Sequence, residues 1–203
     1  FWWGVLRDLP KPSELLTRKQ SLTTKIYDRH GILLYKLYKN QNRSIVALTS
    51  LPEYVVEATL AIEDAEFYQH PGFSIKGISR AMRSNLASSG LQGGSTITQQ
   101  LVKNTLLTSE RTLLRKLKEF VLALEVEYFF TKHEILSMYL NEVGYGGTVY
   151  GIEEAADYYF GKSARELTLA EAALLAGLPA SPTVYSPFGS RPDLATMRQH
   201  LVL

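Results

Sequence analysis

The segment Gln92–Asn104 combines a glycine pair, hydroxyl side chains, amides and one lysine. Gly93 and Gly94 predict a turn, and Ser95 and Thr96 predict the start of a helix. Backbone N–H groups at a helix start lack partners and carry partial positive charge, so they can receive phosphate oxygens. Glycine permits the turn and a close ligand approach. The P-loop spacing is absent, so the segment predicts a phosphate or diphosphate site but not a nucleotide.

The helix that follows is expected to carry polar side chains on one face. At about 100° per residue, Thr96, Gln100 and Lys103 share a side, while Ile97 and Leu101 turn toward a core. A plain solvated helix face would show the same pattern. The preceding glycine pair and the density of uncharged hydrogen-bonding groups favour a ligand site.

A second helix repeats the cationic pattern. Arg111, Arg115 and Lys118 fall at i, i+4 and i+7, with Glu119 beside them. Its other side is apolar, with Leu113, Leu114, Leu117, Phe120, Val121 and Leu124. Such a face alone fits a solvated surface with an Arg115–Glu119 pair. Beside the first cationic face it predicts an anion cradle, in which arginine binds phosphate bidentately and lysine adds a point charge.

A general base is predicted at Glu63. The apolar run 59–62 precedes it, so we expect a carboxylate that is partly buried near a helix end. Desolvation and the charge of Asp64 would both raise its pKa, as a general base at neutral pH requires. The alternative is an exposed acidic turn.

The elements that must position these residues are mainly helices. Residues 25–38 predict a small β-hairpin with its turn at 28–31. The helical candidates are 53–67 (ended by Pro71-Gly72), 74–87, 95–107 and 111–130, followed by helices opened by the capping boxes Thr131/Glu134 and Thr168/Glu171 and by a last one near Pro192. The expected fold class is therefore mainly α with a minor β element near the start.

Composition limits the function classes. The chain has 203 residues, 45% of them hydrophobic, which suits one generous domain. A net charge of +2 gives no broad basic field, so nucleic-acid binding is not expected. The absence of cysteine excludes disulfides and thiol chemistry and suits work outside the bacterial cytoplasm. The four histidines show no metal-ligand spacing.

The first residues allow two interpretations. Phe1–Leu6 is apolar but far shorter than the roughly 20 residues that span a bilayer. It is either a small core strand or a random start with no structural role, or it is the last turn of a transmembrane helix with interfacial tryptophans. The first residue is not Met, which favours the transmembrane helix. Residues 8–24 resemble a linker, which predicts an arm at 1–24 and a domain at 25–203.

The chain also carries five ordered motifs. They are Glu63-Asp64-x-x-Phe67-x-x-His70-x-Gly72; the run from Gly93 to Asn104; Arg115-Lys116-x-x-Glu119; Ile135-Leu136-x-x-Tyr139-Leu140-Asn141; and Tyr159-Phe160-Gly161-Lys162 through Leu167-Thr168 to Glu171. Together they resemble the peptidoglycan glycosyltransferase domain of class A penicillin-binding proteins, glycosyltransferase family 51. The resemblance covers essentially the whole chain from about Leu9.

The resemblance implies a lysozyme-like helical fold with a larger lobe and a smaller, membrane-dipping lobe that contains residues 73–91. It implies an enzyme that polymerises lipid II. Glu63 would deprotonate the 4-hydroxyl of an N-acetylglucosamine acceptor, and Asp64 would support it. The oxygen would attack the anomeric carbon of a lipid-linked N-acetylmuramic acid with inversion, forming a β-1,4 bond and releasing polyprenyl diphosphate.

The resemblance also implies the residues that contact substrate. They are Phe67, His70, Arg80, Ser95, Thr96, Gln100, Lys103, Asn104, Arg111, Arg115 and Lys118. Glu119 resembles the family's second essential carboxylate near the diphosphate. It would help hold a divalent metal, Mg²⁺ or Mn²⁺, or orient lysine and arginine side chains.

The expected setting is the outer face of a bacterial cell membrane. The implied partners are lipid II, the growing glycan strand, the membrane surface and other cell-wall synthesis proteins. The segment from Gly144 to Gly147 and the later 178–182 resemble the bifunctional class. No Ser-x-x-Lys motif is present, so a transpeptidase domain is expected elsewhere on a full-length chain.

One segment departs from the family pattern. Members often carry basic residues after the third motif, where this chain has Glu127-Tyr128-Phe129-Phe130. This predicts an apolar groove edge or a lipid contact. The rival functions are a lysozyme-like lytic hydrolase and a non-catalytic membrane scaffold. Lys103, Arg111 and Arg115 argue against the hydrolase, which has no diphosphate to bind.

Overall fold

The computed structural model describes residues 9–18, 20–77, 79, 94–108, 110, 112–189, 193, 196, 199 and 200. These residues fall into two compact units, one drawn from 1–18 and 60–139 and the other from 19–59 and 140–203. Within the described ranges, no helix is both long enough and apolar enough to cross a membrane.

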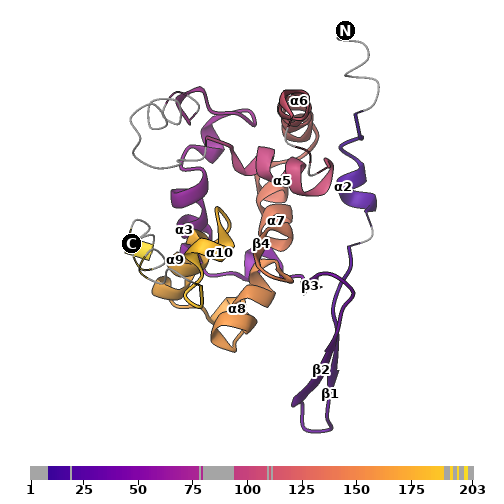
Figure 1. Ribbon diagram of the computed structural model, residues 1–203, viewed down its shortest axis with the longest axis vertical. Helices are drawn as coiled ribbons and strands as arrows, with labels where there is room; N and C mark the ends of the chain where they lie inside the picture. The colour runs from indigo at the N-terminus through magenta and orange to yellow at the C-terminus, as the bar shows by residue number, and fades with distance from the viewer. Residues whose placement is uncertain are drawn as a thin grey trace. The chain divides into compact units, whose positions relative to one another are not determined.

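The first unit is helical. It contains α2 (Glu14–Thr17), the end of α3 (Glu53–Glu63), the 3₁₀ turn η2 (Phe67–Gln69), α5 (Ile97–Thr105), α6 (Leu113–Phe129) and most of α7 (Lys132–Glu142). Helix α5 packs against α6 (Figure 1). The buried side chains between these elements include Phe67, Ile97, Leu101, Val102, Leu122, Ala123, Val126, Ile135, Leu136 and Tyr139.

Side-chain caps fix where these helices begin. Thr96 and Gln99 form a reciprocal capping box at the start of α5. The Thr112 hydroxyl accepts from the backbone of Arg115 at the start of α6. At the start of α7 the amide of Thr131 donates to the Glu134 carboxylate, at 2.8 Å. Each cap satisfies N–H groups that would otherwise lack a partner.

The second unit mixes short strands and helices. The hairpin strands β1 (Thr24–Tyr27) and β2 (Leu33–Leu37) pair antiparallel (Figure 1). A three-stranded sheet has the order β3 (Asn42–Arg43), β5 (Val149–Tyr150), β4 (Gly144–Gly146). The remaining elements are η1 (Leu48–Ser50), α8 (Ile152–Phe160), η3 (Ala164–Glu166), α9 (Leu169–Gly177) and α10 (Pro182–Tyr185).

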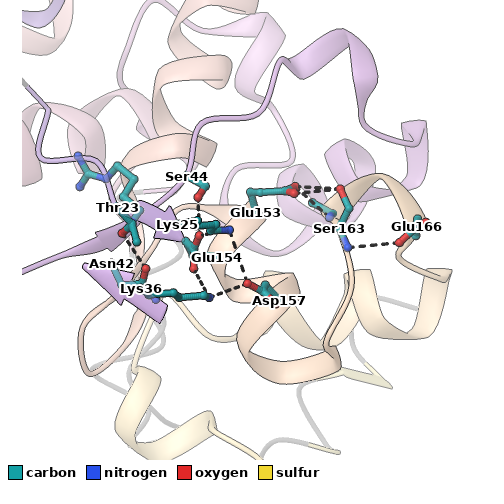
Figure 2. Close-up of polar contacts among 12 residues, drawn as sticks. Thr23, Lys25, Lys36, Asn42, Ser44, Glu153, Glu154, Asp157, Ser163 and Glu166 are labelled. Carbon is teal, nitrogen blue, oxygen red and sulfur yellow. Dashed lines mark hydrogen bonds and ion pairs between the residues drawn. The ribbon is translucent and has the colours of Figure 1, made fainter. Parts of the chain in front are cut away.

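The hairpin is tied to α8 by four charged residues, which we call the hairpin anchor: Lys25, Lys36, Glu154 and Asp157 (Figure 2). Lys25 and Lys36 face each other across the hairpin and point to the same helix. Lys25 Nζ lies 2.6 Å from Glu154 Oε1, and Lys36 Nζ lies 2.8 Å from Oε2. Lys36 also contacts Asp157 at 2.6 Å. The Glu154 side chain is fully buried.

The structure confirms the mainly α fold with a small hairpin near the start of the chain. The expected helix 53–67 is shorter, because it ends at Glu63 and the chain turns before η2. Helices 95–107 and 111–130 are confirmed as α5 and α6, and both capping boxes open helices.

Other expectations lie beyond what the structure tests. Most of the helix expected at 74–87, and the residue Pro192, lie outside the described residues. The lysozyme-like pair of lobes and the division at residue 24 stay predictions. The sheet β3-β5-β4 was not predicted, because strands of two or three residues carry no readable alternation.

Candidate active site

Glu63 is the last residue of α3, and its carboxylate is held by an amide. Gln100 Nε2 donates to Glu63 Oε2 at 2.7 Å. The Tyr139 hydroxyl donates to Gln100 Oε1 at 3.2 Å, which orients the amide. Glu63 is half-buried, so the expected position at a helix end, partly shielded from water, is confirmed.

Asp64 connects the end of α3 to the start of α5. Its side chain is buried; Oδ2 accepts from the amide of Ile97 at 3.0 Å, and Oδ1 lies 2.8 Å from His70 Nε2. Ile97 is the first residue of α5, so the carboxylate lies at the positive end of that helix. The neighbour of the predicted base is thus fixed from two sides.

Thr96 and Phe67 lie in the protein interior. The Thr96 hydroxyl donates to the carbonyl of Gly72 at 2.7 Å and caps α5, and the side chain is buried. The expectation that Thr96 shares an open face with Gln100 and Lys103 is therefore wrong, because its backbone lies outside the helix in the extended region. The ring of Phe67 is only 1% exposed and packs in the core.

Glu119 is the centre of a group of cations. Its side chain is 1% exposed. Arg115 NH1 donates to Glu119 Oε2 at 3.1 Å, which confirms the expected i,i+4 pair. Lys116 Nζ donates to Glu119 Oε1 and, at 2.9 Å, to the Ser95 hydroxyl. Helix α6 is thus linked to the residue that precedes the cap of α5.

Lys103 belongs to the same electrostatic neighbourhood. Its side chain is exposed, yet the surrounding protein removes enough water to lower the pKa of its ammonium group. Glu119 opposes this shift most strongly and Glu63 more weakly, while Arg115 and Lys116 add to it. The predicted base and the predicted anion-binding cations therefore act on one another in this unit.

The other predicted substrate-binding residues lie at the surface of the first unit or outside the described residues. Asn104 is exposed and Lys118 is half-buried on α6. Arg80 and Arg111 lie outside the described residues. His70 is brought to Asp64, as described above.

Two residues at the site were missed by sequence reasoning. Glu127 accepts from the Thr98 hydroxyl at 2.5 Å and lies 2.7 Å from Lys132 Nζ. Lys132 Nζ also donates to the carbonyl of His70 at 2.7 Å and lies 4.4 Å from the centre of the Phe67 ring. Glu127 and Lys132 are on different helices, so no helical spacing could reveal the pair.

For the divalent metal expected at Glu119, the described residues provide no complete set of side-chain donors. In the part of the chain that the structure describes, no group of three or more His, Cys, Asp or Glu side chains could hold a metal ion. Both Glu119 oxygens accept from Arg115 and Lys116. These described residues therefore do not fit a metal held by side chains alone.

Comparison with known proteins places this arrangement in a family. Residues 30–203 match the family model of the Transglycosylase family. The chain is 44% identical over 200 residues to "Penicillin-binding protein 1A" of Aquifex aeolicus (strain VF5), covering 98% of this chain and 27% of that protein. It is 43% identical over 182 residues to "Penicillin-binding protein 1F" of Bacillus subtilis (strain 168), covering 89% and 25%.

A solved structure is also similar. The crystal structure of Penicillin-Binding Protein 1A from Haemophilus influenzae gives a TM-score of 0.47 at 26% identity, covering 91% of this chain and 17% of that one. The chain spans about a quarter of the length of the curated relatives named above.

The match over residues 30–203 and the identity to the two penicillin-binding proteins define the class: this is a transglycosylase domain of peptidoglycan synthesis. The chain belongs to the transglycosylase family, in the form found in class A penicillin-binding proteins.

Proposed function

We propose that this domain polymerises lipid II, a disaccharide-pentapeptide on polyprenyl diphosphate, into β-1,4-linked glycan strands with inversion. The observation that carries the proposal is the shared neighbourhood of Glu63 and the cations. Glu63 is bound to Gln100 on α5, and one turn further along that helix Lys103 is influenced by Glu63, Glu119 and Arg115. A carboxylate base and a cationic surface are the two parts that this transfer requires.

In the proposed reaction Glu63 takes the proton of the acceptor's 4-hydroxyl. The oxygen forms a bond to the donor's anomeric carbon while the bond from that carbon to the diphosphate breaks. The electron pair leaves on the polyprenyl diphosphate, and the proton stays on Glu63 until solvent removes it. The hydrogen bond from Gln100 aims the carboxylate, and such placement by itself lowers the barrier.

The cations stabilise the leaving group. Arg115, Lys116 and Lys103 carry three positive charges around the single charge of Glu119. Burial lowers the pKa of Lys103, and the repulsion from Arg115 and Lys116 adds to that shift. An arriving diphosphate offsets this repulsion and gains charge-assisted hydrogen bonds. A diphosphate neutralised in this way departs without a general acid, so a second acidic group is not needed.

The buried residues of the first motif hold the base in place. Asp64 binds the start of α5 and His70, and Phe67 fills the core beneath them. We assign these three, with Thr96, to positioning and leave substrate contact to the exposed or half-buried Ser95, Gln100, Lys103, Asn104, Arg115 and Lys118.

The setting is part of the proposal. The relatives named above are about four times longer than this chain, which supports further domains, including a transpeptidase domain, on a full-length chain. We place the domain in the bacterial cell envelope, on the outer face of the membrane, where lipid II and the growing glycan strand are its substrates.

The test is polymerisation of purified lipid II in detergent. We expect glycan polymer from the wild-type chain and, for Glu63→Gln, a turnover lowered about 10²- to 10⁴-fold with folding retained, as for loss of a general base. The matched control is Glu57→Gln, an exposed carboxylate on the same helix, which should leave turnover unchanged. Full turnover in Glu63→Gln would refute the role of Glu63.

A parallel incubation with finished glycan separates the rival enzyme. Fragmentation of that glycan without polymer from lipid II would identify a lytic hydrolase. Neither polymer nor fragments, with donor still bound, would support a non-catalytic scaffold.

A further inference from the structure

Lys132 is placed where helix electrostatics disfavour it. It is the first residue of α7, and a cation at a helix start opposes the helix dipole. Its side chain is 22% exposed and its ammonium is engaged on several sides. Such a placement needs compensating contacts. The ammonium of Lys132 makes them with His70, Glu127 and the Phe67 ring, next to the candidate active site.

We propose that Lys132 is a positioning residue for the transfer reaction, an inference that rests on the proposed function. Its ammonium fixes the segment 64–72, which carries Asp64 and His70, against α6 and α7. The Lys132 cluster consists of Lys132, Glu127, Thr98 and His70.

The first path from Lys132 runs through the segment 64–72. Lys132 Nζ donates to the carbonyl of His70 at 2.7 Å, and the ring of His70 binds Asp64 at 2.8 Å. Asp64 directly follows Glu63 and also binds the amide of Ile97. A shift of His70 is therefore transmitted to the residue next to the base.

The second path runs through α5. Lys132 lies 2.7 Å from the Glu127 carboxylate, which accepts from Thr98 at 2.5 Å. Thr98 lies in the first turn of α5, and Gln100 in the same helix binds Glu63 at 2.7 Å. The first path ends on Asp64, the residue after the base, and the second ends on α5, the helix that carries the amide partner of the base. One ammonium therefore constrains the surroundings of Glu63 from two sides.

The charge is needed, because the stem alone would not hold Glu127. The side chain of Glu127 is 8% exposed. Without Lys132 its buried charge would keep, among the described residues, only the Thr98 hydroxyl as a hydrogen-bond partner. Lys132→Met keeps an unbranched apolar side chain and removes the charge that lies over the Phe67 ring. Lys132→Arg keeps the charge and can rebuild the pair.

The experiment combines kinetics with hydrogen exchange on the full 203-residue chain. Lys132→Met should lower kcat about 10- to 100-fold with KM nearly unchanged, the range seen when a reacting group is misplaced. Lys132→Arg should recover much of kcat. Lys162→Met is the matched control, because the side chain of Lys162 is 26% exposed, close to that of Lys132, and forms an ion pair with Glu171 at 2.6 Å. It should leave kcat unchanged.

Hydrogen exchange reports positioning without any assay of activity. The amides of Phe67 and Ile97, which donate to Asp64, should exchange roughly tenfold faster in Lys132→Met and at the wild-type rate in Lys162→Met. Glu127→Gln is a second variant, which keeps the shape of the side chain. Glu127→Gln should also lower kcat and speed exchange of the Phe67 and Ile97 amides, each by less than Lys132→Met. This variant keeps the test decisive if Lys132→Met fails to fold.

The outcomes separate this inference from the proposed function. Wild-type exchange rates in both variants would overturn the positioning role, whatever the enzyme does. Faster exchange with normal kcat would overturn it as well and leave Lys132 a stabilising residue only. If the wild-type chain makes no polymer, the proposed polymerase function is refuted. Faster exchange in Lys132→Met would then still show that Lys132 holds the segment 64–72 in place.

Discussion

Gly72 shows how closely the segment after η2 approaches α6. Its backbone has φ of +88°, a conformation that side chains with a Cβ rarely adopt. A Cβ built there would lie 2.9 Å from the carbonyl oxygen of Ala123. Its own carbonyl accepts from Thr96, so this residue links the segment, α5 and α6.

We therefore predict that Gly72→Ala destabilises the protein beyond the strain of its backbone. Strain alone costs about 1–3 kcal/mol. Gly161→Ala is the matched control, since Gly161 has φ of +68° and a Cβ added there would meet nothing within 4 Å. Urea unfolding should give a larger loss for Gly72→Ala. Equal losses would mean that the backbone relaxes away from Ala123.

Glu119 leads to a prediction about metal. Because its oxygens are taken by Arg115 and Lys116, the donor-free protein should not bind Mn²⁺ at this carboxylate. Paramagnetic resonance during a Mn²⁺ titration should show only free ion, and added lipid-linked diphosphate should create the first bound signal. Stoichiometric binding without donor, lost in Glu119→Gln, would show a protein metal site.

At the scale of elements, the hairpin anchor joins two strands to α8 through a buried carboxylate. Burial by itself raises the pKa of Glu154, but hydrogen bonds from Lys25, Lys36 and Ser44 outweigh it and lower the pKa to about 2. Lys36 shows the opposite shift: burial lowers its pKa, and Asp157 and Glu154 raise it by more. The ionised form of Glu154 is therefore bound more tightly in the folded protein.

This predicts a loss of stability in acid. A carboxylate with a depressed folded pKa stabilises the fold at pH above its ordinary value of 4.5, and the contribution disappears as the pH falls toward about 2. The total is roughly 3 kcal/mol. Glu154→Gln should be less stable than wild type at pH 7, and the difference in unfolding free energy should shrink at pH 3. A difference that is equal at both pH values would contradict the assignment.

At the scale of the whole molecule, the segment Glu127–Phe130, which differs from the family pattern, has two largely buried and two exposed side chains. Glu127 is nearly buried and paired with Lys132, and Phe130 is 9% exposed. Tyr128 and Phe129 are 85% and 65% exposed, and their rings meet edge to face at 5.2 Å. An exposed aromatic pair of this kind suits the interface between water and lipid.

We predict that this pair contributes to membrane association of the protein. In sedimentation with anionic lipid vesicles, Tyr128→Ser/Phe129→Ser should pellet less than wild type. Tyr158→Ser serves as control, because Tyr158 is 58% exposed on α8, in the other unit. Equal pelleting of all three proteins would remove Tyr128 and Phe129 from the lipid contact.

Local signals in the sequence were sufficient for the hairpin and for several of the helices. The hairpin followed from alternation around a turn at 28–31, and α5 and α6 from apolar periodicity bounded by caps. The end of α3 was missed because Asp64 gives its carboxylate to Ile97, a contact 33 residues away. No local pattern contains that information.

What the sequence alone determined is the family, the mainly α fold and the kinds of residue at the site, because motif order and helix periodicity are properties of neighbours along the chain. Only the tertiary structure decided which of those residues face inward. It buries Thr96 and Phe67, which therefore support the site from the interior. It places Lys103 where Glu119 and Glu63 affect its pKa. It also pairs Lys132 with Glu127 and with the carbonyl of His70. The physical reason is that burial and ion pairing depend on helices meeting in space, and residue spacing along one helix does not specify its partners.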